Sequence, residues 1–326
     1  MASLLPSDVI VPTPIAQYVG ALICEKSAFI ASAAAGADLD AGAQLGGVFY
    51  TKAQWEEDLT ADEKIDGSSS TPGKVQSFAD VAPVLRRKRV RGIVDGSNAV
   101  IGRLAEETPD AAVMNQAAAY WARRVDAAFV STLSGLFSAS GGPCLAGNSK
   151  DVSRTAAPAV PASFSYLVDA GAMVGDSFTD LAVMVCHSKV WADLTKEAGQ
   201  KVTWDVFGDS RRFFYDGKRV IVSDNVPTSG SSTYKKYWTF LLSPGSLYFA
   251  AQQAMREIVQ VDAKVPETIY TQTMHFACAA RGCKWNVSTE NPANSDLATY
   301  TNWALRSSET NIAKIVGIAA LISNAS

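Results

Sequence analysis

The sequence has little of what marks a nucleic-acid binder or a secreted, disulfide-rich protein. Lys and Arg number 29 against 32 Asp and Glu, so the formal net charge is only −3, whereas a dedicated DNA reader usually carries a basic excess. Five cysteines in 326 residues are an odd number and too few for a disulfide framework. The cysteine content therefore predicts a reducing compartment, and any contact with DNA must be local.

Long hydrophobic runs are also missing. The most apolar window, Ile315 to Ile322, is far shorter than the roughly 20 residues that a membrane-spanning helix needs. The apolar stretch near the N-terminus is interrupted by Glu25 and Lys26, and no basic segment precedes it, so a cleaved signal peptide is not expected. We predict a protein with no membrane partner.

Catalytic and metal-binding motifs are incomplete. Ser138 lies in a segment that lacks the first glycine of a nucleophile elbow, and Gly67 to Lys74 has the wrong spacing for a phosphate-binding loop. The two histidines, His187 and His275, end different predicted strands, and Cys278 and Cys283 lack a second pair of ligands. We therefore predict no enzyme, no catalytic residue, no metal and no cofactor.

What is present suits a globular protein with a large core. Hydrophobic residues make up 48% of the chain and charged residues 19%, and the length corresponds to roughly two domains of about 150 residues. Helical and strand-like periodicities alternate irregularly, which predicts an α+β fold. A Gly-, Ser- and Pro-rich connector over residues 140–162 separates the two expected units.

The first part of the chain reads as an arm followed by a long excursion. After three prolines, apolar residues from Ile15 to Ile30 recur at helical spacing, which predicts an arm over residues 1–45 with one amphipathic helix. Residues 46–92 read as a two-stranded extended loop with a Gly- and Ser-rich tip. Its outgoing limb is acidic, with Glu56, Glu57 and Asp58, and its returning limb is basic.

Several further elements can be predicted locally, among them strands over residues 246–251 and 274–279 and a short helix over residues 296–305. Thr108-Pro109-Asp110 is a helix start, and an apolar stripe continues from there to Phe137, so we expect one long helix over residues 108–138. Asp216-Gly217 predicts a tight hairpin turn, and the aromatic cluster around it favours core or interface packing over a ligand pocket. That cluster consists of Trp204, Phe207, Phe213, Phe214 and Tyr215.

The returning limb contains the densest cluster of basic residues in the sequence, which we call the basic run. It comprises Arg86, Arg87, Lys88, Arg89 and Arg91. Three interpretations stay open: pairing with the acidic limb within or between subunits, a solvated face, or contact with phosphates. We favour the first and predict a subunit interface made by Glu56, Glu57, Asp58, Arg86, Arg87, Lys88 and Arg89.

Several strings resemble the major capsid proteins of tailed double-stranded-DNA bacteriophages, whose fold is named after the phage Hong Kong 97. The order of arm, extended loop, spine helix and late axial domain is similar over nearly the whole chain. The strings are Leu167-Val-Asp-Ala170 with Gly175-Asp176, Leu181 to Ser188, Gly217 to Pro227, and the segment from Asn291-Pro292 through Trp303 to Ile312. One subgroup of that family joins neighbours through a Lys-Asn isopeptide, but no partner motif can be matched to Lys64 or Lys74.

The resemblance implies a fold with four parts. These are the arm, the extended loop, a peripheral domain over 93–162 and 257–290 that contains the spine helix, and an axial domain over 163–256 and 291–326. It also implies a structural subunit that forms pentamers and hexamers of an icosahedral shell around packaged double-stranded DNA. Implied partners are a scaffolding protein, a portal and a decoration protein; the implied location is the virion, after assembly in the host cytoplasm.

Three alternatives remain at this stage. An encapsulin-like nanocompartment shell would share the fold and enclose cargo enzymes instead of DNA. An α+β enzyme with an unrecognised site would be a monomer or small oligomer whose ligand stabilises it. A DNA-binding module would need the basic run to give a steep salt dependence.

Overall fold

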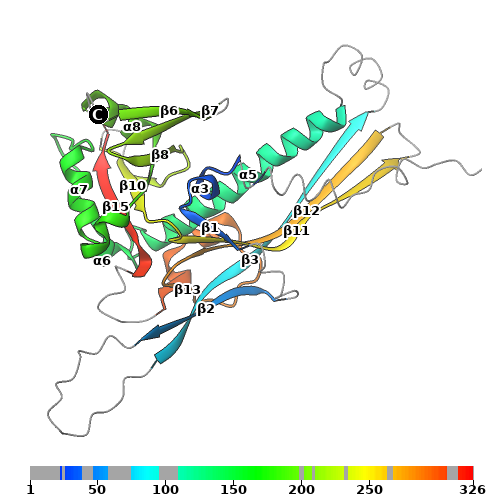
Figure 1. Cartoon of the computed structure of the whole chain (residues 1–326), viewed down its shortest axis with the longest axis horizontal. Helices are drawn as coiled ribbons and strands as arrows, with labels where there is room; N and C mark the ends of the chain where they lie inside the picture. The colour runs from blue at the N-terminus through cyan, green and yellow to red at the C-terminus, as the bar shows by residue number, and fades with distance from the viewer. Residues whose placement is uncertain are drawn as a thin grey trace, which may run out of the picture.

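The computed structural model has two β-sheets and one long helix that runs along one of them (Figure 1). It describes residue 23 and residues 26–38, 47–57, 75–94, 109–197, 202–207, 210–230, 234–262, 267–306 and 315–325. Helices and strands are mixed along the chain, which confirms the α+β prediction. No helix in these ranges is long and apolar enough to cross a membrane.

The long helix α5, Pro109–Leu136, confirms the predicted spine helix. Its 28 residues span about 42 Å at 1.5 Å per residue. Trp121, Val125, Phe129 and Leu133 recur at intervals of four and are fully buried, so one face of the helix lies on the core. Near the end of the helix Gly135 is required, because a Cβ atom there would lie 2.3 Å from the carbonyl oxygen of Leu297.

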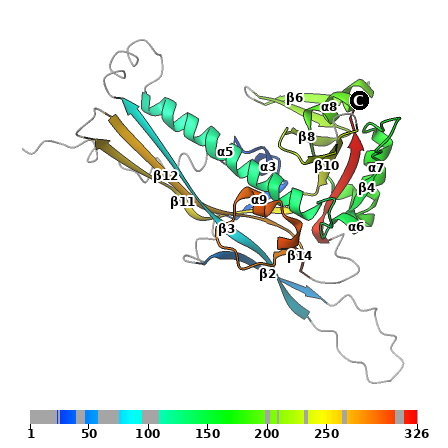
Figure 2. The ribbon, with the colours of Figure 1, turned by 180° about the vertical axis from the view of Figure 1, so that it is seen from behind.

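The seven-stranded sheet carries α5 on one of its faces (Figure 2). Its order is β1-β11-β12-β3-β13-β14, with β2 pairing β3 on the side. The longest strands, β3, β11 and β12, form an antiparallel ribbon beside the helix. The bounds are β1 Ala35–Asp38, β2 Phe49–Glu57, β3 Val75–Val94, β11 Leu247–Asp262, β12 Glu267–Ala280, β13 Cys283–Trp285 and β14 Trp303–Leu305.

The eight-stranded sheet is buried on both faces at its centre. Its order is β4-β15-β10-β5-β8-β7-β6, and β9 pairs β10. Alternate residues of each central strand enter two different cores: Phe240 packs toward the end of α5, whereas Leu241 packs toward helices α7, Phe164–Ala172, and α8, Ser188–Glu197. The strands are β4 Ser149–Asp151, β5 Val183–Cys186, β6 Val202–Phe207, β7 Ser210–Tyr215, β8 Lys218–Val222, β9 Thr228–Ser229, β10 Lys236–Leu242 and β15 Ile318–Asn324.

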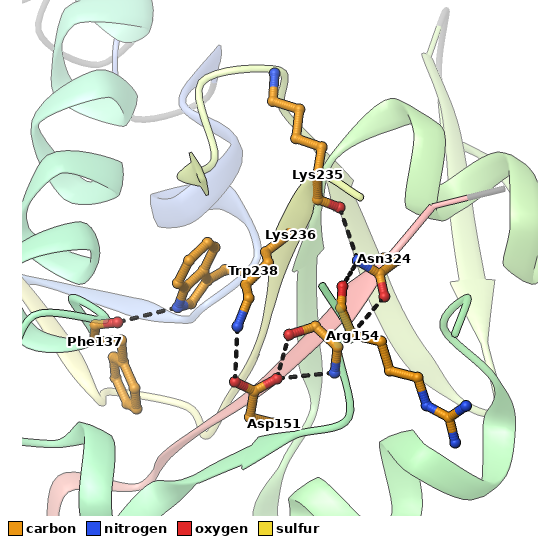
Figure 3. Close-up of polar contacts among 8 residues, drawn as sticks. Phe137, Asp151, Arg154, Lys235, Lys236, Trp238 and Asn324 are labelled. Carbon is orange, nitrogen blue, oxygen red and sulfur yellow. Dashed lines mark hydrogen bonds and ion pairs between the residues drawn. The ribbon is translucent and has the colours of Figure 1, made fainter. Parts of the chain in front are cut away.

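Polar contacts join this sheet to the end of α5 and fix its edge strand (Figure 3). The indole Nε1 of Trp238 donates to the carbonyl oxygen of Phe137 at 3.0 Å. Lys236 Nζ lies 3.3 Å from Asp151 Oδ2, and the Asn324 amide donates to two carbonyl oxygens of neighbouring segments. The first bond joins the eight-stranded sheet to the end of α5, and the others satisfy polar groups where β4, β10 and β15 lie side by side.

The described part of the predicted arm packs on α5. Residues 1–22, which include most of the predicted amphipathic helix, lie outside the described ranges, and the short helix α3 covers Ala28–Ala31. Phe29 stacks on Phe129 with ring centroids 5.4 Å apart. Ser27 Oγ donates to Asp126 Oδ1 at 2.6 Å. The arm is therefore anchored to the helix by one aromatic contact and by hydrogen bonds from Ser27 and the Ala28 amide to Asp126.

Some predicted boundaries were wrong. The helix expected over 296–305 is a single turn, α9 (Asn294–Leu297), followed by a short 3₁₀ turn and then β14. The chain leaves the helix because Trp303 Nε1 donates back to the carbonyl oxygen of Leu297 at 2.7 Å and Trp303 then pairs with β13. Strands β11 and β12 extend well beyond the predicted 246–251 and 274–279, because their distal halves are covered on one face only and lack apolar runs.

The assignment of strands to the two sheets does not follow the predicted domain ranges. Strand β11 begins at Leu247 and joins the seven-stranded sheet, although 163–256 was assigned to the axial domain. Within 291–326, β14 joins the seven-stranded sheet and β15 joins the eight-stranded sheet. The names axial and peripheral for these ranges stay a prediction.

Candidate assembly surface

A two-stranded extension leaves the seven-stranded sheet where β2 pairs with the first half of β3 (Figure 2). The pairing runs from Phe49 opposite Pro83 to Glu57 opposite Val75. The second half of β3, which contains the basic run, instead pairs with β12 beneath the helix. The expectation that acidic and basic limbs form one hairpin was therefore wrong: β3 is long enough to belong to both the extension and the body.

The acidic and basic segments of one chain lie far apart. Glu56 is opposite Gln76, ten residues along β3 from Arg86, and ten strand residues span about 33 Å. Asp58 lies outside the described residues. Pairing between these segments within one subunit is therefore wrong as an interpretation, since β3 is a continuous strand that holds them at this separation.

The strand alternation divides the basic run between two faces of the sheet. Arg87 and Arg89 lie on the helix side and are half-buried. Arg87 donates to Asn291 Oδ1 at 2.7 Å and to the carbonyl oxygen of Pro292 at 2.6 Å, and the Arg89 guanidinium lies 4.5 Å from the Tyr120 ring centroid. These two arginines therefore have partners inside their own subunit.

Arg86 and Lys88 lie on the opposite face, which no helix of the described chain covers. We call this surface the open face; it also carries the exposed side chains of Arg256, Val90 and Ile258, the last two 45% and 38% exposed. No carboxylate among the described residues forms an ion pair with Arg86, Lys88 or Arg256. The open face thus joins uncompensated positive charge to exposed apolar area, a combination typical of contact surfaces.

His275 lies beside Arg86 in the register of β12 and β3, at the border of the open face. Its pKa is lowered from 6.5, first by burial and then by the positive charge of Arg86. The imidazole is therefore neutral near pH 7. The electrostatics of the open face at that pH come from its arginines and its lysine.

A buried ion pair fixes the base of the extension. Asp80 of β3 is 0% exposed; its Oδ1 accepts from Arg306 Nη1 at 3.2 Å and from the Gly282 amide at 3.0 Å. Burial raises the pKa of Asp80 to about 6. The contact ties β3 to the ends of β13 and β14. Sequence reasoning missed these residues, although a lone acid inside the apolar run 78–85 was an available signal.

The residues considered for catalysis or metal binding lie in separate places. His187 Nδ1 lies 3.6 Å from Asp224 Oδ1 at the end of β5, and His275 is in the other sheet. Cys278 and Cys283 are buried, and burial raises the pKa of the Cys278 thiol. Within the described ranges no three His, Cys, Asp or Glu side chains form a group that could hold a metal ion.

The predicted aromatic cluster packs around one helix where the structure describes its side chains. Trp191 of α8 lies 5.8 Å from Phe213 and 6.4 Å from Tyr215, measured between ring centroids. Tyr215 is buried in the core on that side of the sheet. These contacts favour packing over a ligand site. The side chains of Trp204 and Phe207 lie outside the described set.

Comparison with known proteins identifies the family. The family described as Gp13-like, major capsid protein 13-like, matches residues 96–315. The major capsid protein of Bacillus phage SPP1 is 29% identical over 310 residues, which cover 91% of this chain and 92% of that protein. The residues that match the family model include the spine helix and most of the strands of both sheets.

Solved structures show the same fold at low sequence identity. The head structure of Helicobacter pylori bacteriophage KHP40 aligns with a TM-score of 0.56 at 8% identity, over 92% of this chain and 91% of that chain. The capsid of Ralstonia phage GP4 gives 0.54 at 9% identity, over 90% and 87%. Together with the family match, these likenesses confirm the Hong Kong 97-type fold. The chain belongs to the major capsid protein 13-like family, and it is a structural subunit of a phage capsid shell.

Proposed function

We propose that copies of this chain form pentamers and hexamers of an icosahedral shell around packaged double-stranded DNA, assembling in the host cytoplasm. The observation that carries the proposal is the separation of the acidic segment at Glu56 and Glu57 from the basic segment at Arg86 and Lys88. Each segment is about 33 Å from its complement in the same chain, so in the proposed shell a second copy supplies that complement. Head-to-tail contacts of this kind close into rings when the rotation permits.

In the proposed contact, the extension of one subunit lies on the open face of a neighbour. The acidic residues Glu56, Glu57 and Asp58 meet Arg86 and Lys88, while Val90 and Ile258 supply apolar area at the same surface. Arg87 and Arg89, which belong to the originally predicted interface, support this contact indirectly, because they hold β3 against α5 and the segment after Asn291.

The test is a charge reversal on the open face. We expect R86E/K88E to fold normally and to form shells poorly, as measured by sedimentation velocity and negative-stain electron microscopy. R123E, an exposed site on α5 with the same change of charge sign, serves as the control and should assemble normally. Combining R86E/K88E with E56K/E57K should restore particles. Normal particle yield from R86E/K88E contradicts the proposal.

The contents of the shell distinguish the two shell functions. Purified particles should contain double-stranded DNA; particles filled with a foreign enzyme and free of DNA would support the nanocompartment alternative. The resemblance to tailed-phage capsid proteins also supports a scaffolding protein, a portal and a decoration protein as partners. Co-expression of each neighbouring gene with this chain, followed by particle counting, tests whether a scaffold is needed.

A further inference from the structure

A pocket of about 410 Å³ lies between α5, β3 and the segment after Asn291, beside the helix that covers the seven-stranded sheet. Its basic and aromatic lining residues are Arg87, Lys88, Tyr120, Trp121, Arg124 and Phe276. Figure 2 shows α5 and β3 side by side at this place. The pocket and the proposed contact between neighbours share one residue, Lys88.

Two arginines stack on the aromatic ring of Tyr120 at the pocket wall, and a third, Arg87, lies in the pocket lining. The guanidinium carbons of Arg89 and Arg124 lie 4.5 and 5.4 Å from the Tyr120 ring centroid. Arg124 Nε also donates to the Tyr120 hydroxyl at 3.2 Å, and Arg87 is held by Asn291 and Pro292. The stacking and hydrogen bonds fix the planar guanidinium groups in place before any ligand arrives.

Positive charges gather here without a carboxylate to balance them. Burial and the nearby Arg124 both lower the pKa of Arg87, so the two like charges raise each other's free energy. Within the described residues, none of these arginines forms an ion pair. Three acids on the neighbouring elements accept hydrogen bonds from neutral groups: Asp126 from Ser27 and Ala28, Asp296 from the Ala293 amide, and buried Glu257 from the side chain of Gln272. None of them lines the pocket, so a ligand can supply the negative charge there.

We propose that this pocket binds the phosphate groups of nucleic acid, so that α5 and the helix side of β3 contact the packaged DNA. Arginine forks match the geometry of phosphate oxygens, and the pocket lining offers two of them, Arg87 and Arg124, together with the ammonium group of Lys88. An acidic segment of a neighbour is the competing occupant, because Lys88 also belongs to the open face; the other basic residue of that proposed contact, Arg86, does not line the pocket. The inference rests on the proposed function, since it names where the shell meets its contents.

The test measures binding of a fluorescent 20-base-pair duplex to the full-length subunit over a series of NaCl concentrations. Each lost phosphate contact should reduce the slope of log K against log salt by about 0.9. We expect that reduction for R124Q. The matched control is R123Q, because Arg123 is the exposed neighbour on the same helix and does not line the pocket.

The outcomes separate this inference from the shell proposal. Equal slopes for R124Q and R123Q, or no measurable binding by the wild-type subunit at low salt, overturn the phosphate site. Displacement of the duplex by a peptide of residues 50–66, with the same dependence on Arg124, assigns the pocket to a neighbouring subunit instead and also overturns it. R124Q should still form shells, so a failure of wild-type assembly counts against the shell proposal alone. Thermal melting of each variant verifies that it is folded.

Discussion

The two sheets are built from similar apolar residues but differ in what covers them. In the eight-stranded sheet, every residue of β5 and β15 is buried, because α7 and α8 cover one face and α5 with its neighbours covers the other. In the seven-stranded sheet, α5 covers one face only, and beyond Leu85 the other face carries Arg86, Lys88 and Val90 in exposed positions. The first sheet completes its core within the subunit, whereas the second leaves a surface for another molecule.

This difference predicts which substitutions should destabilise the folded subunit and which should impair only the assembly of subunits. Truncating a side chain in a closed core creates a cavity and lowers the free energy of unfolding. Changing a charge on the open face removes nothing that the single subunit uses. The following predictions test this division, from the largest expected effect to the smallest.

Trp121→Ala, in the helix over the seven-stranded sheet, and Phe240→Ala, in the eight-stranded sheet, should each lower the free energy of unfolding by about 3–5 kcal/mol. Both side chains are fully buried, and Trp121→Ala also removes the Nε1 donor that bonds Gln272 Oε1 at 3.2 Å. Urea denaturation followed by circular dichroism measures the change. Val222→Ala, at an exposed site of β8, is the control and should change the free energy of unfolding by less than about 0.5 kcal/mol. Native-like stability of either truncated variant would contradict the packing described above.

Asp80→Asn should destabilise the base of the extension by about 3 kcal/mol, because it leaves the buried charge of Arg306 without its carboxylate. Hydrogen exchange resolved by segment distinguishes a local from a global effect. We expect faster exchange in β3, β13 and β14, with β10 and β15 unchanged. Uniform acceleration in both sheets would show that the two regions unfold as one unit.

Ser27→Ala should lower the free energy of unfolding by about 1–2 kcal/mol, because Asp126 loses a charge-assisted hydrogen bond of 2.6 Å. Burial raises the pKa of Asp126, and the bond from Ser27 opposes that rise. Limited proteolysis near Lys26 should become faster while the spine helix stays intact. Ser32→Ala, nearby on the same segment, removes only bonds to neutral groups, the carbonyl oxygen of Phe29 and the Ala34 amide, and serves as the control.

Arg86→Gln should leave folding almost unchanged and raise the pKa of His275, since one of the two causes of its lowered pKa disappears. Folding lowers this pKa below 6.5, so His275 binds a proton more tightly in the unfolded chain than in the folded one. His275 therefore reduces the free energy of unfolding as the pH falls through 6.5. That loss should be smaller in the variant. NMR titration of the two histidines measures both pKa values, and His187 beside Asp224 is the internal control. An unchanged pKa of His275 would show that Arg86 points away from the imidazole.

Local signals predicted individual elements well where the residues involved are close in sequence. The Pro109 start and the apolar stripe located α5, and Asp216-Gly217 located the turn between β7 and β8, where Asp216 and Gly217 both adopt positive φ. The helix expected at 296–305 was wrong because its end depends on a contact of Trp303 with β13. The basic run was noticed, but its division between two faces depends on which side α5 covers.

The sequence by itself determined the long helix, the turn between β7 and β8 and the presence of two opposite charge segments, because periodicity, capping and composition act over a few residues. The resemblance to the family rested on the local strings quoted above. The tertiary structure decided where those segments lie. The register of β3 with β2 and β12 separates Glu56 from Arg86, and the position of α5 divides Arg86 and Lys88 from Arg87 and Arg89. These relations join residues far apart in the chain, and only packing of the whole subunit, which buries the helix stripe on the sheet, can fix them.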